Sequence, residues 1–264
     1  MQNAKVVYTP LPEGYKPMPN TSNSDPKLQN YFQQIIGSLI YLMIGTRPDI
    51  AYSVIKLSQF SADPSQDHVN KALHIIRYLI GTRYYHLKYD GKKAEGLIAH
   101  TDSDWATDEN PAAKRKSTTG YFFQLASAPI VWSSRQQKTI ASSSTEAEYM
   151  AMSDASKQLM WIRSLITELG YNLAPIPVNG DNQGSIFMAQ NPITEKRSKH
   201  IDIKYHVIRE YVKEGHIKLY YIPSDENPAD MFTKVLGRVK FEKFRNMLGI
   251  EFFSEHPKAY ELSS

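Results

Sequence analysis

Apolar side chains recur every three or four residues in the first third of the chain, which is the spacing of helices with one buried face. Ile35 and Leu39 lie on one such stripe, which Pro48 interrupts. A further helix is expected to open at Asp63-Pro64, because aspartate is a good N-cap and proline is favoured in the first turn. The pattern predicts helices from residue 28 to the residues before the proline, over 49–60 and over 64–80.

After Gly91 the pattern changes to short apolar runs separated by turns and by longer helical stretches. Three strands joined by hairpins come first, and helices then alternate with two further strands. This order favours an α/β fold with a mixed five-stranded sheet flanked by helices. The expected strands cover residues 97–101, 119–125, 130–134, 176–180 and 217–222, and the expected helices cover 145–169, 183–190 and 201–214 before a last helical pair.

The residues before the first helix are rich in proline and polar residues. Proline restricts the backbone and removes hydrogen-bond donors, so this stretch is expected to be an extended arm or linker. The predicted divisions of the chain are an extended arm (1–27), a small all-helical segment (28–93), a mixed α/β domain (94–250) and a tail (251–264).

Composition narrows the class of protein. The 264 residues are 41% hydrophobic and 22% charged, which is ordinary globular usage and excludes wholesale disorder. The absence of cysteine excludes disulfide scaffolds, thiolate zinc sites and cysteine nucleophiles, and it suits a reducing compartment. The longest apolar run, Ile35 to Ile44, is too short to span a bilayer, and no charged-then-apolar leader opens the chain, so neither a membrane segment nor secretion is expected. The net charge of +4 permits a polyanionic partner without requiring one.

Four carboxylates lie at the ends of predicted strands or at the starts of predicted helices. Asp102 ends the first strand of the mixed domain, and Asp181 ends the fourth. Glu148 lies in the first turn of the long helix, and Asp230 begins the helix after the fifth strand. Ligands bind beyond the carboxyl ends of strands in open sheets, so the two strand-end aspartates are expected to face one cleft. Clustered carboxylates are hard ligands that suit Mg²⁺ or Mn²⁺, although each acid alone also has a structural interpretation as a cap or turn residue.

Helix geometry distinguishes Glu148 from its neighbour Glu146. The positions that share a face with Glu148 are apolar, so this side chain is expected to point toward the sheet. The positions that share a face with Glu146 are polar, and Ser143 and Glu146 have the spacing of a capping box. Spacing does not choose between Asp102 and Asp104, because both lie on the same side of an extended chain.

Several short motifs follow one another between residues 97 and 248. They are TDSDWA (101–106), RKSTTGY (115–121), WSSRQQ (132–137), STEAEY (144–149), DNQ (181–183), KHIDIKYH (199–206) and NPAD (227–230). In this order they resemble the ribonuclease H domain of copia-type retrotransposon Pol polyproteins. The helical segment, through IGSLIY (36–41) and TRPDIA (46–51), is similar to the end of the reverse transcriptase of the same polyproteins. The adjacent Asp-Asp pair of that polymerase is missing from the sequence, so polymerisation by this chain alone is not expected.

The resemblance implies a ribonuclease H-like fold and an endonuclease that hydrolyses the RNA strand of RNA–DNA hybrids during reverse transcription. It gives Asp102, Glu148, Asp181 and Asp230 the catalytic role of holding two Mg²⁺ ions, with Mn²⁺ as the alternative, for metal-assisted hydrolysis. The implied partners are the hybrid and the reverse transcriptase polymerase domain of the same polyprotein. The implied location is cytoplasmic, within virus-like particles. One departure is that the loop 222–227 lacks the histidine that many family members carry before the last aspartate.

Hybrids are recognised through phosphates and 2′-hydroxyl groups, which basic and amide side chains can bind. The sequence offers basic clusters at 114–116 and 196–204, and an amide pair directly after the fourth strand. A histidine or an arginine from the helix around His200 and His206 is a candidate for the role of the missing loop histidine; the alternative is that His206 packs against the sheet or caps a surface. The three tryptophans are expected in the core. The substrate-binding candidates are Lys116, Asn182, Gln183, Arg197, Lys199, His200 and His206.

Two further interpretations remain at this stage. The chain could be a catalytically inactive retrotransposon remnant, or a hybrid-binding module that needs the missing polymerase. A third class, integrases and resolvases of the same fold, is disfavoured because integrases place the catalytic glutamate on a late helix, whereas Glu148 lies on the first helix of the mixed domain.

Overall fold

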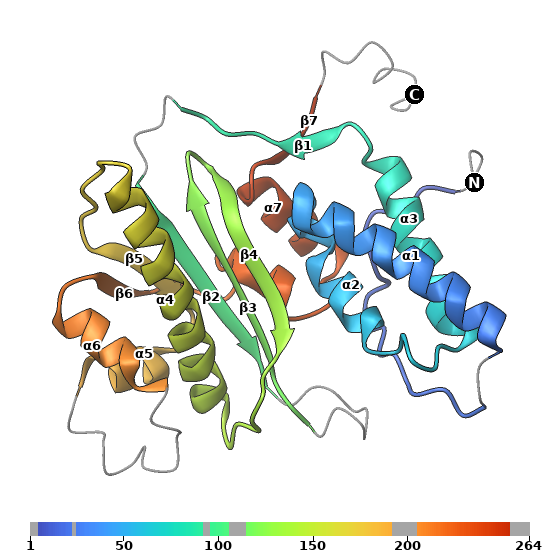
Figure 1. Ribbon diagram of the computed structural model, residues 1–264, viewed down its shortest axis with the longest axis horizontal. Helices are drawn as coiled ribbons and strands as arrows, with labels where there is room; N and C mark the ends of the chain where they lie inside the picture. Colours follow the sequence, from blue (N-terminus) through green and yellow to red (C-terminus); the bar gives the residue numbers. More distant parts are fainter. Residues whose placement is uncertain (1–4, 23–24, 92–95, 106–114, 192–204, 254–264) are drawn as a thin grey trace. The chain divides into compact units, whose positions relative to one another are not determined.

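The computed structural model describes residues 5–22, 25–91, 96–105, 115–191 and 205–253 (Figure 1). The chain forms two compact units, and each is assembled from separate stretches of the sequence. Unit 1 comprises Met1–Lys88, Asp108–Arg115 and Lys234–Ser264, and unit 2 comprises Tyr89–Thr107 and Lys116–Thr233.

Unit 2 contains the expected mixed five-stranded sheet, in the order β4-β3-β2-β5-β6 (Figure 1). The pairs β2–β3 and β3–β4 are antiparallel, whereas β5 runs parallel to β2 and β6 runs parallel to β5. Because β2, β5 and β6 are parallel, their carboxyl ends lie at the same edge of the sheet. The strands are β2 (Ile98–Asp104), β3 (Thr118–Leu125), β4 (Ala128–Gln136), β5 (Ile176–Gly180) and β6 (Ile217–Tyr221).

Different elements cover the two faces of this sheet. Tyr121 and Phe123 of β3 belong to the hydrophobic core that also contains the buried side chains of the long helix α4. On the opposite face, the ring of Phe122 stacks on His100 at 4.8 Å and lies 5.7 Å from the ring of Phe232 in the 3₁₀ helix η5. The helical elements of unit 2 are α4 (Ser144–Glu168), α5 (Gln183–Gln190), α6 (Val207–Lys213) and η5 (Pro228–Phe232).

Unit 1 is mainly helical, as expected for its amino-terminal part. The carboxy-terminal helix α7 and a two-stranded ribbon of β1 and β7 also belong to it. Residues 5–22 of the predicted arm contain neither helix nor strand, whereas Pro26 and Lys27 at its end already belong to the first helix. The elements are α1 (Pro26–Gly45), η1 (Pro48–Ile50), α2 (Ala51–Ser58), α3 (Gln66–Gly81), β1 (Tyr85–Leu87), α7 (Arg238–Met247) and β7 (Ile250–Phe252).

The predicted start of α3 at Asp63-Pro64 is wrong. The N-cap is Ser65, whose hydroxyl accepts the backbone N–H of His68 while its own N–H donates to the His68 Nδ1 at 3.0 Å. Asp63 instead accepts a hydrogen bond from the amide of Asn20 at 3.0 Å. The aspartate side chain is thus held by the amino-terminal arm, and the serine that follows the proline takes the capping role.

The TRPDIA motif lies in unit 1, where it forms a buried ion pair. The Arg47 guanidinium donates to both carboxylate oxygens of Asp49, at 2.7 and 2.9 Å, and the hydroxyl of Tyr78 donates to the same carboxylate at 2.6 Å. Burial by itself would raise the pKa of the Asp49 carboxyl, but the Arg47 charge and these hydrogen bonds hold this pKa below its ordinary value. The motif therefore joins η1 to α3.

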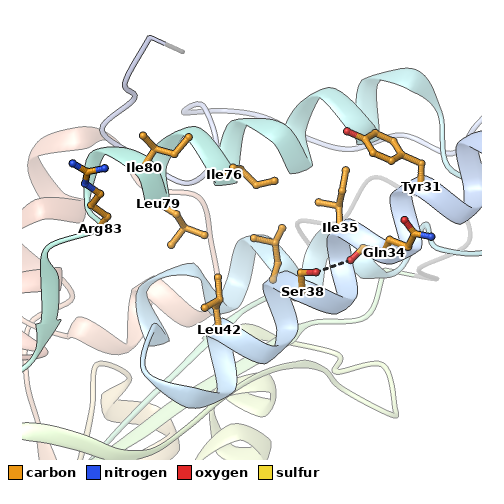
Figure 2. Close-up of a pocket in the computed structure, with 10 residues that line it drawn as sticks. Tyr31, Gln34, Ile35, Ser38, Leu42, Ile76, Leu79, Ile80 and Arg83 are labelled. Carbon is orange, nitrogen blue, oxygen red and sulfur yellow. Dashed lines mark hydrogen bonds between the residues drawn. The ribbon is translucent and has the colours of Figure 1, made fainter. Parts of the chain in front are cut away.

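An apolar groove of about 890 Å³ lies between α1 and α3 in unit 1 (Figure 2). Ile35, Leu39 and Leu42 line it from α1, and Leu79 and Ile80 line it from α3.

No helix in the described part of the chain is long and apolar enough to cross a membrane.

The expected fold class is confirmed, but the predicted domain limits at 27, 93 and 250 stay predictions. The compact units divide the chain differently at its carboxy-terminal end, where unit 1 takes the residues from Lys234 onward. The last helical pair is divided in the same way, since η5 lies in unit 2 and α7 lies in unit 1.

Candidate metal centre

Three of the four predicted acids come together in unit 2. Asp102, Asp181 and Asp230 each offer a carboxylate oxygen, and these atoms all lie within 4.8 Å of one another. They come from the end of β2, from the residue after β5, and from η5. Asp102 and Asp230 are buried, whereas Asp181 is half-buried. Among the described residues, Asp102 belongs to this group and Asp104 does not, which decides between the two strand positions.

Asp102 is held on the face of the sheet that η5 covers. It pairs with Gly120 across the β2–β3 ladder, and the Thr233 hydroxyl donates a hydrogen bond to its Oδ2. A Cβ atom on Gly120 would lie 2.6 Å from the Thr233 methyl carbon and 2.7 Å from Phe232 Cβ. Glycine at this position therefore lets η5 approach the sheet closely enough to reach Asp102.

Asp230 lies in the 3₁₀ helix η5, and the N-cap of this helix holds it in place. Asn227 is the N-cap of this short helix, and its side-chain oxygen accepts the Ala229 N–H. The amide group of the same Asn227 donates to the carbonyl oxygen of Thr101 in β2 at 2.9 Å. One buried asparagine thus caps η5 and attaches it to the strand that carries Asp102, so the hydrogen bonds of its side chain bring the two aspartates together.

Asp181 follows β5 directly, where the chain turns into α5. The side-chain oxygen of Asn182 caps α5 by accepting the Ser185 N–H at 2.8 Å. The Ser224 hydroxyl, from the loop after β6, donates to Asp181 Oδ2 at 2.5 Å. This hydroxyl lies in the loop for which the resemblance leads one to expect a histidine, and nothing in the periodicity of the sequence indicates the contact.

Glu148 does not join the group of three, although it points toward the sheet as predicted. It is buried in the first turns of α4, and its Oε1 accepts the backbone N–H of Ser103 at 3.0 Å. Ser103 is the residue after Asp102, and because side chains alternate along a strand its side chain lies on the face that α4 covers. Glu148 thus reaches the same end of β2 from the other face of the sheet.

Glu146 differs from its prediction. It is buried rather than solvated, and its carboxylate accepts both the N–H and the hydroxyl of Ser142. The Ser143 hydroxyl accepts the Glu146 N–H, so half of the predicted capping box forms. The other half is replaced because the carboxylate turns one residue further back, to Ser142.

Gln137 is a buried residue near the site, and no role for it is predicted from the sequence. Its amide donates to the Ala147 carbonyl at 2.9 Å and to the Thr119 hydroxyl at 3.1 Å. These contacts join the end of β4 to β3 and to the start of α4. The only signal in the sequence is that Gln137 belongs to the WSSRQQ motif of the family resemblance. That motif does not indicate what the side chain contacts.

The predicted substrate-binding residues are only partly described. Lys116 lies two residues before β3, whose first residue pairs with Asp104, and so it lies at the same end of the sheet as Asp102. Asn182 and Gln183 follow Asp181 directly, with Gln183 exposed. His206 lies elsewhere in unit 2, at the N-cap of α6, where its Nδ1 shares a hydrogen bond with the Tyr149 hydroxyl at 2.9 Å. Arg197, Lys199 and His200 lie outside the described residues.

The prediction that the tryptophans lie in the core is wrong, because two of them are exposed and Trp132 is only half-buried. Trp161 is 59% exposed on α4, and Trp105 is 43% exposed at the end of β2. Trp105 donates its indole N–H to the Ala141 carbonyl at 3.1 Å. Helical and strand spacing alone did not reveal this, because an amphipathic side chain can lie at the border of a core with one edge in water.

Comparison with known proteins gives the family. The retrovirus-related Pol polyprotein from transposon TNT 1-94 of Nicotiana tabacum is 39% identical over an alignment of 256 residues, and the match covers 95% of this chain and 19% of the relative. The corresponding polyprotein from transposon RE2 of Arabidopsis thaliana is 39% identical over 251 residues, which are 95% of this chain and 17% of the relative. The chain belongs to the copia-type retrotransposon Pol polyproteins. It spans less than a fifth of the length of these Pol relatives.

The solved structures that resemble this chain include LC11-RNase H1 in complex with an RNA/DNA hybrid. The TM-score is 0.39 at 17% identity, and the match covers 52% of this chain and 94% of that one. Unit 2 has the predicted α/β fold, with a mixed five-stranded sheet flanked by helices. No family model matches the chain.

Proposed function

We propose that this chain is the ribonuclease H of a copia-type retrotransposon, an endonuclease that hydrolyses the RNA strand of RNA–DNA hybrids during reverse transcription. The observation that carries the proposal is the group formed by Asp102, Asp181 and Asp230, whose ligand atoms lie within 4.8 Å of one another. The group lies at the edge of the sheet where β2 and β5 have their carboxyl ends, in a chain of this family, and open sheets bind ligands at this edge.

The three aspartates fit a divalent cation. They offer only hard oxygen ligands, and two of them are buried, so their mutual repulsion is screened little by water. We propose that Asp102, Asp181 and Asp230 hold two Mg²⁺ ions, with Mn²⁺ as the alternative, and that Glu148 supplies the fourth carboxylate from α4. When bound, such ions lower the pKa of the attacking water and stabilise the leaving 3′ oxygen.

The residues of the chain orient these acids and attract the substrate. Hydrolysis adds water across the P–O3′ bond, so one product carries a 5′-phosphate and the other a 3′-hydroxyl group. Lys116 would attract the phosphate backbone that the acids repel, and Asn182 and Gln183 would donate hydrogen bonds to the minor groove beside Asp181. Arg197, Lys199, His200 and His206 stay candidates for the same polyanion.

The proposed partner corresponds to a part of the relatives that this chain does not span. The relatives are about five times longer than this chain, and we propose that the reverse transcriptase polymerase domain of the same polyprotein delivers the hybrid to unit 2. The proposed place of action is cytoplasmic, within virus-like particles, where reverse transcription would supply the hybrid.

The test is cleavage of a labelled RNA–DNA hybrid by the full chain with Mg²⁺ or Mn²⁺. Asp102→Asn and Glu148→Gln are compared with Asp154→Asn, a change of the same kind at an acid of α4 that pairs with Arg135 and Lys157. Loss of the cation ligands is expected to remove several kcal/mol of transition-state stabilisation, and so to slow cleavage by roughly a hundredfold or more. Asp154→Asn should cleave at nearly the normal rate.

The outcomes distinguish the proposal from its alternative. Cleavage confined to the hybrid, with single-stranded RNA spared and both site variants inactive, would support the enzyme. Binding of the hybrid without cleavage, by a folded chain supplied with metal, would instead favour a hybrid-binding module or an inactive remnant.

A further inference from the structure

We propose that Thr233 is a positioning residue that sets the divalent-cation affinity of the site by fixing the orientation of the Asp102 carboxylate. The inference rests on the proposed function in one respect, namely that Asp102 is a cation ligand. Thr233 is not one of the four acids. The proposal is that its hydroxyl group, rather than the bulk of its side chain, orients the Asp102 carboxylate.

The hydroxyl of Thr233 lies between two of the acids. Its Oγ1 donates to Asp102 Oδ2, and it also lies 3.2 Å from the backbone carbonyl oxygen of Asp230. Thr233 is 0% exposed and Asp102 is 1% exposed. A hydrogen bond from a buried hydroxyl to a carboxylate is among the stronger kinds, because water does not readily take its place.

The methyl group of Thr233 prevents the side chain from turning away. A Cβ atom built on Gly120 would lie 2.6 Å from this methyl carbon, so the methyl group occupies the space that the glycine leaves open. Gly120 is the residue opposite Asp102 in the β2–β3 ladder. The methyl group thus rests on β3 while the hydroxyl faces β2, and a threonine is held with its donor directed at Asp102.

This contact has a consequence for cation binding. A carboxylate fixed at Oδ2 presents its other oxygen in one direction, so less rotational freedom is lost when a cation binds. Groups that orient a metal ligand typically change metal affinity by about 10–100-fold when they are removed. Ser224 makes a similar contact with Asp181, but that contact is exposed, so water can replace the serine hydroxyl.

The experiment measures Mn²⁺ binding to the full chain by titration calorimetry in the absence of nucleic acid. Thr233→Val removes the hydroxyl and keeps the shape, whereas Thr233→Ser keeps the hydroxyl and removes the methyl group. Thr233→Ala forms a second pair with Thr233→Ser, since these two variants also differ by the hydroxyl alone. Thr101→Val is the matched control, because Thr101 is a buried threonine beside Asp102 whose hydroxyl donates to the carbonyl of Asn179.

We expect Thr233→Val and Thr233→Ala to weaken Mn²⁺ binding about 10-fold or more, Thr233→Ser to stay within about threefold of the parent chain, and Thr101→Val to have little effect. In hybrid cleavage, the hydroxyl-free variants should show lower kcat at the same KM. Far-UV circular dichroism identifies any variant that does not fold. If Thr233→Val does not fold, the Ala and Ser pair still isolates the hydroxyl.

Three results would overturn the proposal: normal Mn²⁺ affinity in a folded Thr233→Val chain, equal loss of affinity in Thr233→Ser and Thr233→Ala, or no Mn²⁺ binding by the parent chain. Its failure is distinguishable from that of the nuclease. A chain that binds Mn²⁺ through Asp102 and Thr233 but does not cut hybrid keeps this inference and loses the proposed function. If the parent chain cuts hybrid and the Thr233→Val chain does so equally well at unchanged Mn²⁺ affinity, the proposed function is kept and this inference is lost.

Discussion

At the scale of single residues, Gly120 decides how closely η5 can approach the sheet. The position pairs with Asp102, and any side chain there would meet Phe232 and Thr233. A sequence pattern marks this glycine only as an interruption in an apolar strand. Its role follows from a neighbour more than a hundred residues away, so close backbone approach explains the glycine better than a turn does.

Gly120→Ala is expected to destabilise the protein by about 1–3 kcal/mol, because the added methyl group overpacks a filled contact. Displacing η5 should also weaken Mn²⁺ binding, since Asp230 and Thr233 both lie on or beside this element. Urea unfolding and Mn²⁺ titration measure the two effects. Gly96→Ala is the control, because no atom lies within 4 Å of the Cβ built there, and equal effects of the two variants would contradict the explanation.

At the scale of elements, helix starts show how capping and burial act together. Ser65 caps α3 through a reciprocal contact with His68, whose ring stacks on Phe60 at 4.1 Å. Burial lowers the pKa of His68 from its ordinary value of 6.5, against the opposing charge of Asp67. Burial likewise lowers the pKa of His74, which lies on the same helix. Both rings are therefore favoured in the neutral form when the chain is folded.

The sign of the pH dependence follows from these shifts. Below pH 6.5 the unfolded chain binds protons that the folded chain does not, so the free energy of unfolding is greatest above pH 6.5 and falls as the pH is lowered. His68→Gln removes one titrating group and keeps an acceptor for the Ser65 N–H. Its urea unfolding between pH 7.5 and 5 should depend less on pH than that of the parent chain, and the double variant with His74→Gln should depend less still. An unchanged slope in His68→Gln would refute the argument.

At the scale of the whole molecule, the net charge is positive but the candidate site is acidic, so the two have opposite effects on a polyanionic substrate. A chain of net charge +4 is drawn weakly to a polyanion, yet its candidate site gathers three carboxylates. Cations near the site are needed to offset that repulsion, and Lys116 lies at the same end of the sheet. The basic residues 196–204 offer further charge in the sequence.

Lys116→Gln should reduce the salt dependence of hybrid binding. Each phosphate contact contributes roughly one unit to the slope of log affinity against log salt concentration, so the slope should fall by about one. Lys218→Gln makes the same change in net charge on β6 and serves as the control. Fluorescence anisotropy with a labelled hybrid in Ca²⁺, to avoid cleavage, measures both. Equal slopes for the two variants would show that only net charge matters.

The sequence by itself determined the order of the five sheet strands and of the main helices, the α/β class and the acids worth examining, because periodicity and turn chemistry are local properties. It also predicted that Glu148 faces the sheet, since helix periodicity relates that residue to its own apolar stripe. It did not predict the ribbon of β1 and β7, whose strands are three residues long and pair across more than 160 positions of the chain. Only the tertiary structure decided that Asp102 rather than Asp104 joins Asp181 and Asp230, and that Thr233 contacts Asp102 across 131 positions of the chain. Strand alternation gives the direction of a side chain, but the packing of η5 against β2 and β3 decides what that side chain meets.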